Sequence, residues 1–375
     1  MQVEIGNYMQ NFGPDRIIKN KWVLQGMQRL GVEVFNVGEW DIDELSAQGV
    51  DLEKDARFIS ANLLSVKTKR PLLHPFLIKR IELPAKRASY KIGFLGLSAR
   101  DSSYVTDGKG YHWEDPLVAA KQWVPELRNQ CDFLIVLACM PSKDAVQLAI
   151  DIPGIDVIVN GYRHQWSDPP AQINKSTVVY AEDEGRVLGE LRLQWGNGEK
   201  PQVIPLNHLL TRVVKDDPEM AAFVAQAKEE ITAQQRNLVL GNAVTAAAKP
   251  PQTNSPFVTS TACASCHAAA FKVWQHSKHA QAIQILKQVR REFDSSCVGC
   301  HTTGRGKTGG FEDLNQTPEL ANVQCEACHG PGKTHRSRPS ESKMAKLDAT
   351  TCIQCHTKSN SPDFDFATYW PKIKH

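Results

Sequence analysis

The first 195 residues alternate between short runs of apolar and β-branched residues, which are typical of strands, and longer segments with helical signals. Helices are predicted over residues 14–30, 116–129 and 143–150, and the first has a proline near its start and Gly31 just beyond its end. Strands are predicted over residues 3–5, 32–37, 57–62, 78–83, 91–97, 133–137, 155–159, 177–180 and 188–194. This alternation predicts an α/β domain of packed layers over residues 1–195.

The rest of the chain follows a different pattern. A helix is predicted from Asp216 to about Gln235, and a polar, proline-containing linker follows it over residues 246–256. Residues 258–375 contain few long aliphatic stretches, so side chains alone could barely build a conventional core there. We therefore expect a layered domain over residues 1–195, an extension helix and linker over 196–257, and a small, mostly helical and irregular domain over 258–375.

Composition narrows the class of protein. The 44 Lys and Arg residues nearly balance the 41 Asp and Glu residues, which argues against a nucleic-acid partner. The longest apolar run, residues 133–140, is far shorter than the roughly 20 residues that span a bilayer, so no transmembrane segment is expected. The cysteines are unusual, because eight of the ten, together with eight of the twelve histidines, lie after residue 255.

These eight cysteines form four copies of Cys-x-x-Cys-His, the attachment signature of c-type haem. In this chemistry the two thiols form thioethers with the porphyrin, and the adjacent imidazole binds its iron. Paired zinc sites would explain the thiols but not the histidine after every second cysteine, and a two-residue gap makes a poor structural disulfide. Four covalent haem c groups are therefore predicted, attached through Cys263, Cys266, Cys297, Cys300, Cys325, Cys328, Cys352 and Cys355.

The histidines match this count. The motifs supply four iron ligands, His267, His301, His329 and His356, and four more histidines remain as second ligands, His276, His279, His335 and His375. Met344 is the only methionine after residue 255, so low-potential bis-histidine haems are expected. His279 is predicted to open a helical stretch that runs to about Val289. His276 lies three residues away on the same helical face, so both could serve different haems or one could be idle. His375 is the terminal residue, and chain ends usually fray.

Residues 258–375 resemble the tetrahaem cytochrome c-554 type family. The resemblance lies in the first motif followed by Trp274, Ser277 and His279-Ala, in Cys297-Val-Gly-Cys-His-Thr-Thr-Gly, and in Cys325-Glu-Ala-Cys-His-Gly-Pro-Gly-Lys-Thr-His335. It implies haems stacked closely enough for fast electron exchange, with His279 and His335 as second ligands. Family members can leave one haem five-coordinate, in which case His276 or His375 is unused.

Residues 3–195 resemble the 5′-nucleotidase branch of the calcineurin-like metallophosphoesterases. The landmarks are residues 3–7, 30–41, 59–63, 92–97, 132–137 and 153–164. The resemblance implies a sandwich of two mixed sheets flanked by helices, with a two-metal centre at the strand ends. However, Asn7 replaces the bridging aspartate, Trp40 the catalytic histidine and Cys139 an isolated metal-binding histidine, and only His164 remains of Gly-His-x-His.

A dinuclear centre needs more ligands than these, so no such centre is expected, and the domain is predicted to serve docking or assembly. Cys131 and Cys139 are too far apart along one strand to bridge, and are expected to be buried apolar residues. The family's opening Asp-x-His strand and a signal peptide are not visible, so we expect the sequence to be N-terminally incomplete or to start at a misassigned Met1. We also expect a partner or further segment to cover the exposed sheet edge.

The leading interpretation is an exported electron carrier, periplasmic or extracellular, that exchanges electrons with other cytochromes. Three alternatives remain open. One is a haem enzyme with a five-coordinate iron that acts on a small nitrogen or sulfur compound. The second is a bifunctional phosphoesterase–cytochrome, and the third is a structural subunit of a larger cytochrome assembly.

Overall fold

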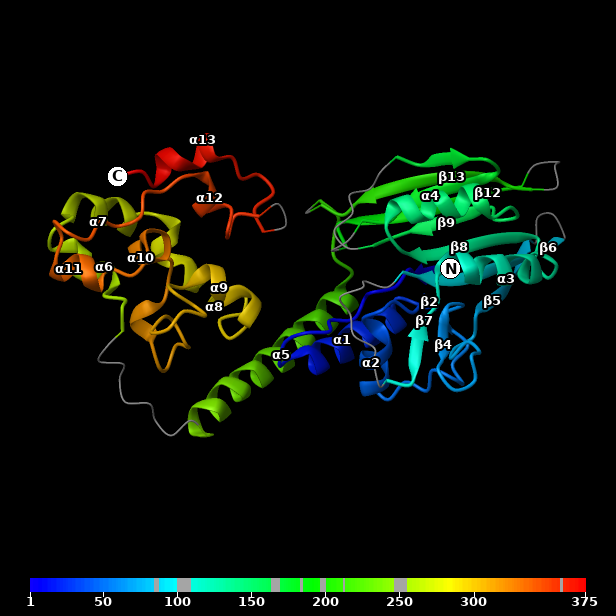
Figure 1. The fold of residues 1–375 in the computed structure, drawn as a ribbon, viewed down its shortest axis with the longest axis horizontal. Coiled ribbons are helices and arrows are strands. Elements are labelled where there is room, and N and C mark those ends of the chain that lie inside the picture. The colour runs from blue at the N-terminus through cyan, green and yellow to red at the C-terminus, as the bar shows by residue number, and fades with distance from the viewer. Residues whose placement is uncertain are drawn as a thin grey trace. The chain divides into compact units, whose positions relative to one another are not determined.

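The computed structural model describes residues 1–83, 88–99, 109–162, 169–182, 185–195, 200–211, 213–245, 255–357 and 360–375. It divides into an N-terminal unit, Met1–Val224, and a C-terminal unit, Ala225–His375. The N-terminal unit combines sheets with helices, whereas the C-terminal unit contains most of one long helix, α5 (Pro218–Thr245), followed by short helices and irregular segments (Figure 1). These architectures confirm the predicted fold class.

A six-stranded mixed sheet forms the centre of the N-terminal unit. Its strand order is β10-β11-β9-β8-β6-β5. Strand β8 is buried along its whole length and pairs in parallel with both neighbours, as expected of a continuous apolar run. The strands are β5 (Phe76–Leu83), β6 (Ala88–Ser98), β8 (Phe133–Cys139), β9 (Val157–Asn160), β10 (Ala171–Ile173) and β11 (Ser176–Tyr180).

A smaller, parallel sheet has the order β1-β2-β3, with strands Gln2–Glu4, Val32–Asn36 and Phe58–Ile59. The resemblance implied two mixed sheets, so this sheet differs in being parallel throughout its described strands. Two antiparallel pairs complete the unit, β4 (Leu63–Ser65) with β7 (Tyr111–Trp113) and β12 (Val187–Gln194) with β13 (Gln202–Leu209).

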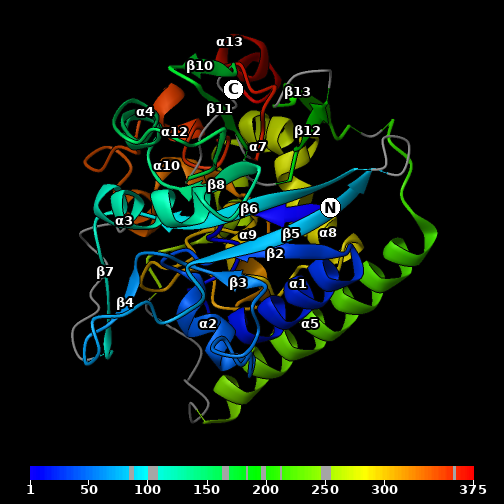
Figure 2. The ribbon, with the colours of Figure 1, turned by 90° about the vertical axis from the view of Figure 1, so that its right-hand side faces the viewer.

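The two main sheets face each other, and helices cover their outer faces (Figure 2). Side chains of β2 and β3 pack against those of β6, β8 and β9 to form the core between the sheets. Helices α3 (Pro116–Arg128) and α4 (Ser142–Asp151) enclose a second core on the far side of the six-stranded sheet. Helices α1 (Arg16–Arg29) and α2 (Asp41–Ala47) lie outside the smaller sheet. This layering places the carboxyl ends of β1, β2, β6, β8 and β9 at the edge where the resemblance expects a metal centre.

Local signals explain the helix boundaries. Asp115 caps α3 by accepting hydrogen bonds from the N–H groups of Leu117 and Val118, and Pro116 occupies the first helical position. Helix α1 ends before Gly31, whose φ of 77° suits glycine. Helix α5 (Pro218–Thr245) begins as predicted but runs ten residues past Gln235, because its sequence offers no proline before residue 250.

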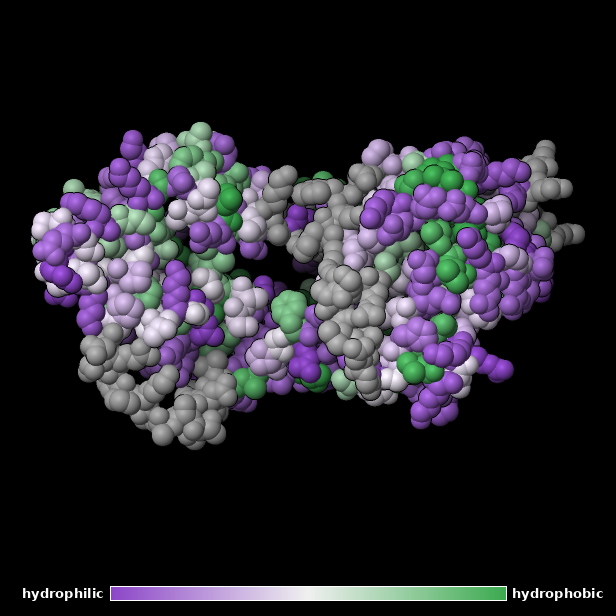
Figure 3. Space-filling model, in the orientation of Figure 1, coloured by the Kyte–Doolittle hydropathy of each residue, from purple (hydrophilic) through white to green (hydrophobic). Residues whose placement is uncertain are grey.

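The C-terminal unit has a small apolar core. In its described residues the core cluster consists of six buried side chains, Phe257, Ile283, Leu286, Val298, Phe311 and Leu320. Strongly hydrophobic residues are also sparse on the face of this unit shown in Figure 3. After α5, its helical segments are α6 (Thr259–Ala264), α7 (Ala268–Gln275), η2 (Lys278–Gln281), α8 (Ala282–Gln288), α9 (Ser295–His301), η3 (Pro318–Leu320), α10 (Cys325–His329), α11 (Lys333–Ser337), α12 (Ala349–Cys352), α13 (Phe366–Tyr369) and η4 (Trp370–Lys372).

Candidate haem centres

Each Cys-x-x-Cys-His motif contains about one helical turn. The backbone N–H of His267 donates to the carbonyl of Cys263, and that of His356 donates to Cys352, each at 2.9 Å. The second and third motifs lie within α9 and α10. Because residues four apart share one side of a helix, the first cysteine and the histidine of a motif point in similar directions. This arrangement suits a porphyrin that is anchored at its edge and bound at its iron.

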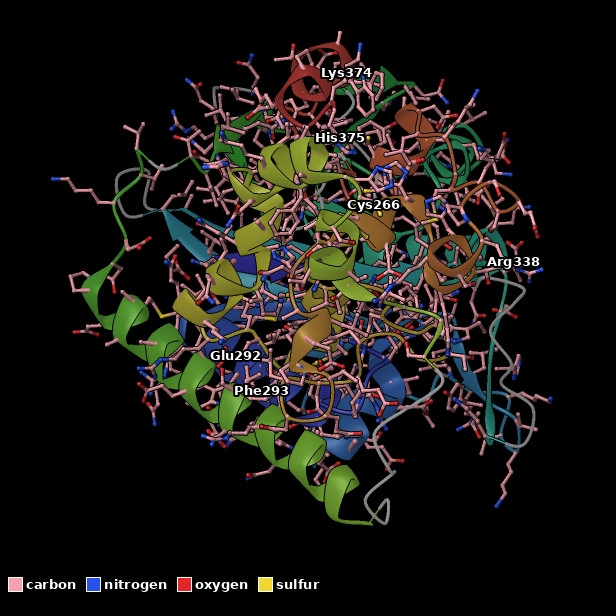
Figure 4. The ribbon with its side chains drawn as sticks, turned by 90° about the vertical axis from the view of Figure 1, so that its left-hand side faces the viewer. Cys266, Glu292, Phe293, Arg338, Lys374 and His375 are labelled. Atoms are coloured by element: carbon pink, nitrogen blue, oxygen red, sulfur yellow. The ribbon has the colours of Figure 1, made fainter. Side chains whose placement is uncertain are left out.

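Three of the motif histidines face a histidine from outside the motifs. The ring centres lie 6.1 Å apart for His267 and His335, 6.1 Å for His279 and His356, and 5.8 Å for His329 and His375. Metal–imidazole bonds of about 2 Å, with about 1 Å more from each nitrogen to its ring centre, separate two axial rings by about 6 Å. The ring separations of the three pairs therefore match those expected of two imidazoles on one iron. His375, together with Cys266, lies on the face shown in Figure 4.

Most of these histidines have their Nδ1 atom engaged. Metal-binding imidazoles usually donate Nδ1–H to an oxygen, which leaves Nε2 for the metal and fixes the ring. Burial, and then the charge of His356, lower the pKa of His279, which favours the neutral ring that a metal requires. The Nδ1 contacts join His276 to Lys272 O (2.8 Å), His301 to Ala282 O (2.8 Å), His329 to Ala345 O (3.0 Å), His335 to Ser342 O (2.6 Å), His356 to Ser361 Oγ (3.1 Å) and His375 to Ile373 O (2.9 Å).

His301 and His276 are not paired in this way. Among the described histidines, no ring faces His301 at the distance seen in the three pairs. The predicted helical stretch from His279 to about Val289 is confirmed as η2 followed by α8. The prediction that His276 shares a helical face with His279 is wrong, because α7 ends at Gln275 and His276 lies outside both helices. Ser277, in an extended conformation, interrupts the helix between them.

Cysteines of different motifs are neighbours. The thiols of Cys263 and Cys325 share a hydrogen bond, which lowers the pKa of Cys263 and raises that of Cys325. Burial and then nearby Cys300 raise the pKa of Cys355 to about 12. Cys328 likewise has Cys352 beside it. The first motif therefore adjoins the third, the second adjoins the fourth, and the third adjoins the fourth, as a continuous haem array requires.

The phosphoesterase-like edge of the N-terminal unit contains a buried carboxylate. Asp41 is fully buried and accepts hydrogen bonds from the N–H groups of Asn7 (2.7 Å), Met9 (2.9 Å) and Gly38 (2.7 Å). A Cβ on Gly38 would come within 2.2 Å of Asn7 Oδ1, so the two loops pack in direct contact. The carboxylate thus ties together the loops that follow β1 and β2.

The other positions expected at a two-metal centre hold poor ligands. Asn7 Oδ1 accepts a hydrogen bond from the backbone of Trp40, and Cys139 is buried, as is Cys131. His164 lies outside the described residues. Among the residues that the structure describes, no group of three or more His, Cys, Asp or Glu side chains could hold a metal ion.

Asp41 predicts a pH dependence of the N-terminal unit. Burial raises its pKa to about 7, although the three N–H bonds oppose this shift. An unfolded aspartate titrates near pH 3.9, so between about pH 4 and 7 the folded state holds a proton that the unfolded state has lost. Stability should therefore fall as the pH rises through this range, by about 2–4 kcal/mol. The measurement is the urea midpoint of the N-terminal unit in the full chain at each pH, read out by pulse proteolysis.

The matched control is Asp41→Asn, which has nothing to titrate at this position. Burial also raises the pKa of Glu4, so both proteins share a second contribution of the same sign. The difference between their slopes of stability against pH therefore isolates the contribution of Asp41. Equal slopes in both proteins would contradict the prediction.

Comparisons with known proteins support both resemblances. Residues 262–330 match the family described as cytochrome c554 and c-prime. Cytochrome c-554 of Nitrosomonas europaea is 36% identical over 107 residues, which cover 24% of this chain and 46% of that protein. A 2′,3′-cyclic-nucleotide 2′-phosphodiesterase/3′-nucleotidase of Yersinia enterocolitica is 29% identical over 168 residues, which cover 38% of this chain and 24% of that protein. The chain thus spans about half of the cytochrome and a quarter of the phosphodiesterase.

Among solved structures, a 5′-nucleotidase precursor of Thermus thermophilus matches with 19% identity and a TM-score of 0.49, covering 62% of this chain and 49% of that one. The NAD nucleotidase of Haemophilus influenzae matches with 16% identity and a TM-score of 0.49, covering 61% and 50%. In the described part of this chain, no helix combines the length and the apolar character needed to cross a bilayer.

Proposed function

We propose that this chain, which joins a cytochrome c554 domain to an N-terminal region resembling 5′-nucleotidases and related metallophosphoesterases, transfers electrons through four covalent haems. One observation carries the proposal: the ring centres of three motif histidines each lie 5.8–6.1 Å from that of a histidine outside the motifs. When bound, each haem iron supplies a one-electron ferric–ferrous couple.

The proposed ligand sets follow from the ring pairs and the motifs. The first, third and fourth haems have two histidines each, and the second has one. The first set is Cys263, Cys266, His267 and His335; the second is Cys297, Cys300 and His301; the third is Cys325, Cys328, His329 and His375; and the fourth is Cys352, Cys355, His356 and His279. His276 is assigned no iron in this scheme.

Bis-histidine ligation suits electron transfer, because it leaves no coordination position for a substrate and the two rings hold the iron rigidly. Phe364 stacks on the ring of His356 at 4.6 Å and restrains it further. The adjacent motifs give electrons a path from one haem to the next. Two imidazoles rather than a methionine sulfur favour low reduction potentials.

The second candidate function concerns His301. Since no described histidine faces its ring, the iron it binds would have an open position. Such an iron could bind and reduce or oxidise a small nitrogen or sulfur compound, with the other three haems supplying or removing electrons. This function would make the electron carrier an oxidoreductase without changing the path between its haems.

Thioether attachment takes place outside the cytoplasm, so we place the mature protein in the periplasm or beyond the cell, with other cytochromes as its redox partners. The N-terminal unit is assigned a docking or assembly role rather than hydrolysis, because Asn7, Trp40 and Cys139 stand at expected metal-ligand positions. Hydrolysis of a nucleotide by the whole protein with added manganese would contradict this role.

The wild-type protein provides the primary test. Intact mass and a pyridine haemochrome spectrum are expected to give four haems per chain. Electron paramagnetic resonance (EPR) of the oxidised protein is expected to show three low-spin haems and one high-spin haem, and cyanide should convert the high-spin signal. Two or fewer haems, or bound zinc, would refute the proposal. Four low-spin haems would refute only the open position at His301.

A further inference from the structure

The third motif contains a buried carboxylate that no iron uses. Glu326 lies between Cys325 and Cys328 and is 1% exposed. It is the only charged residue found between the two cysteines in any of the four motifs. Its oxygens accept hydrogen bonds from the backbone N–H groups of Val258 (2.9 Å to each oxygen), Thr259 (2.8 Å) and Gly332 (2.7 Å). Charge-assisted bonds of this kind offset the cost of burying a carboxylate.

The three donors belong to the two segments that bear one histidine pair. Val258 and Thr259 begin α6, which leads directly into the first motif and His267. Gly332 immediately precedes α11, which carries His335. The two rings lie 6.1 Å apart with an angle of 23° between their planes. One carboxylate therefore holds the segments on both sides of this iron position.

Neighbouring contacts also restrain the two segments that Glu326 holds. Gln324 Oε1 accepts the N–H of Ser260 at 2.7 Å, which fixes the next residue of α6. Thr259 has a φ of 69°, a left-handed conformation that a β-branched residue adopts only when its surroundings enforce it. A Cβ on Gly332 would lie 3.2 Å from Glu326 Oε1, so glycine lets the backbone close on the carboxylate.

The charge of Glu326 also reaches two haem positions. The residue directly follows Cys325 of the third motif, and it accepts the N–H of Thr259, which lies four residues before Cys263 of the first motif. A negative charge in a buried site stabilises ferric over ferrous iron, because the ferric haem carries one more positive charge.

Building on the proposed function, we propose that Glu326 is a positioning residue that orients both axial histidines of the first haem, and that its charge lowers the reduction potentials of the first and third haems. Orientation depends on the hydrogen bonds, whereas the potential depends on the charge. Two substitutions separate these effects.

The first is Glu326→Gln, which removes the charge and keeps one acceptor oxygen. In a potentiometric titration of the full holoprotein, the potentials of two haems are expected to shift upward, and the EPR signal of one low-spin haem should change, because this signal depends on the angle between the two imidazole planes. The matched control is Asp313→Asn. Asp313 is also a buried carboxylate that accepts backbone N–H bonds, from Asn315 and Gln316, but these residues bear no iron ligand.

The second is Gly332→Ala, which crowds Glu326 Oε1 without altering its charge. It is expected to change the same EPR signal and to leave the potentials close to those of the wild type. If Glu326→Gln does not accumulate, Gly332→Ala tests the positioning role alone. Variants with four haems and unaltered EPR signals and potentials would overturn the inference. A wild type with fewer haems, or without bis-histidine signals, would instead overturn the proposed function.

Discussion

Replacing His335 with alanine is expected to double the number of haems that bind cyanide, from one to two per chain. The first haem would lose the ring that faces His267 at 6.1 Å, and its iron would become high-spin. Attachment through Cys263 and Cys266 does not involve His335, so four haems should remain. The measurements are the high-spin EPR intensity of the oxidised protein and a spectrophotometric cyanide titration. Added imidazole should occupy the vacated position and restore the low-spin spectrum.

His276→Ala is the matched control, because it removes a histidine from the same domain whose ring faces no other described histidine. It should leave the spin states and the cyanide stoichiometry unchanged. If His276→Ala raises the cyanide stoichiometry and His335→Ala does not, the ligand sets proposed here are incorrect. If both raise it, His276 serves the iron assigned to His301, and the wild type has no open position.

The central strands of the six-stranded sheet were predictable because they are buried on both faces, whereas the half-exposed edge strand β10 was not predicted. The continuous apolar run of β8 indicates a strand buried on both faces without any alternation of polar and apolar residues. Strand β13 was missed, since Pro205 interrupts its pattern and proline is confined to strands whose N–H groups are unpaired. Strand β13 forms a two-stranded sheet with β12, and in such a pair proline can face the open edge.

The four motifs were predictable from local spacing, whereas the histidine pairs were not. A motif histidine lies directly after its second cysteine, so a five-residue window identifies it. Its partner comes from elsewhere in the fold: His279 precedes His356 by 77 residues, and His335 follows His267 by 68. No periodicity encodes such separations. The sequence therefore predicts how many second ligands are available and leaves their assignment to tertiary structure.

Glu326 escaped the sequence analysis for a related reason. A glutamate inside a haem motif gives no sign of being buried, and its partners are backbone N–H groups that every sequence contains. The one available signal was that the corresponding positions of the other motifs hold uncharged residues, Ala264, Val298 and Ile353. Hydrogen bonds to the main chain are invisible in a sequence until the fold brings the segments together.

Replacing both Cys325 and Cys328 with serine is expected to remove the third haem and to unfold much of the chain after residue 320. The apolar core cluster of the C-terminal unit ends at Leu320, and in the described part of residues 321–375 no apolar side chain is fully buried. The third and fourth haems, whose motifs lie in this segment, and the first, which His335 would bind, would have to supply its apolar surface. Without the third haem, His375 also loses the iron that would hold the segment around it.

Limited proteolysis with mass spectrometry measures this effect. Cleavage after residue 320 should accelerate about tenfold or more, which corresponds to at least about 1.4 kcal/mol of lost local stability. The N-terminal unit, whose three core clusters contain no haem ligand, should resist as in the wild type. The matched control is Cys131→Ala, since Cys131 is buried in one of these clusters and should leave four haems in place. If residues 321–375 of the double variant resist cleavage as well as those of the wild type, the polypeptide holds this segment without the third haem. Porphyrin would then not replace the apolar core that the segment lacks.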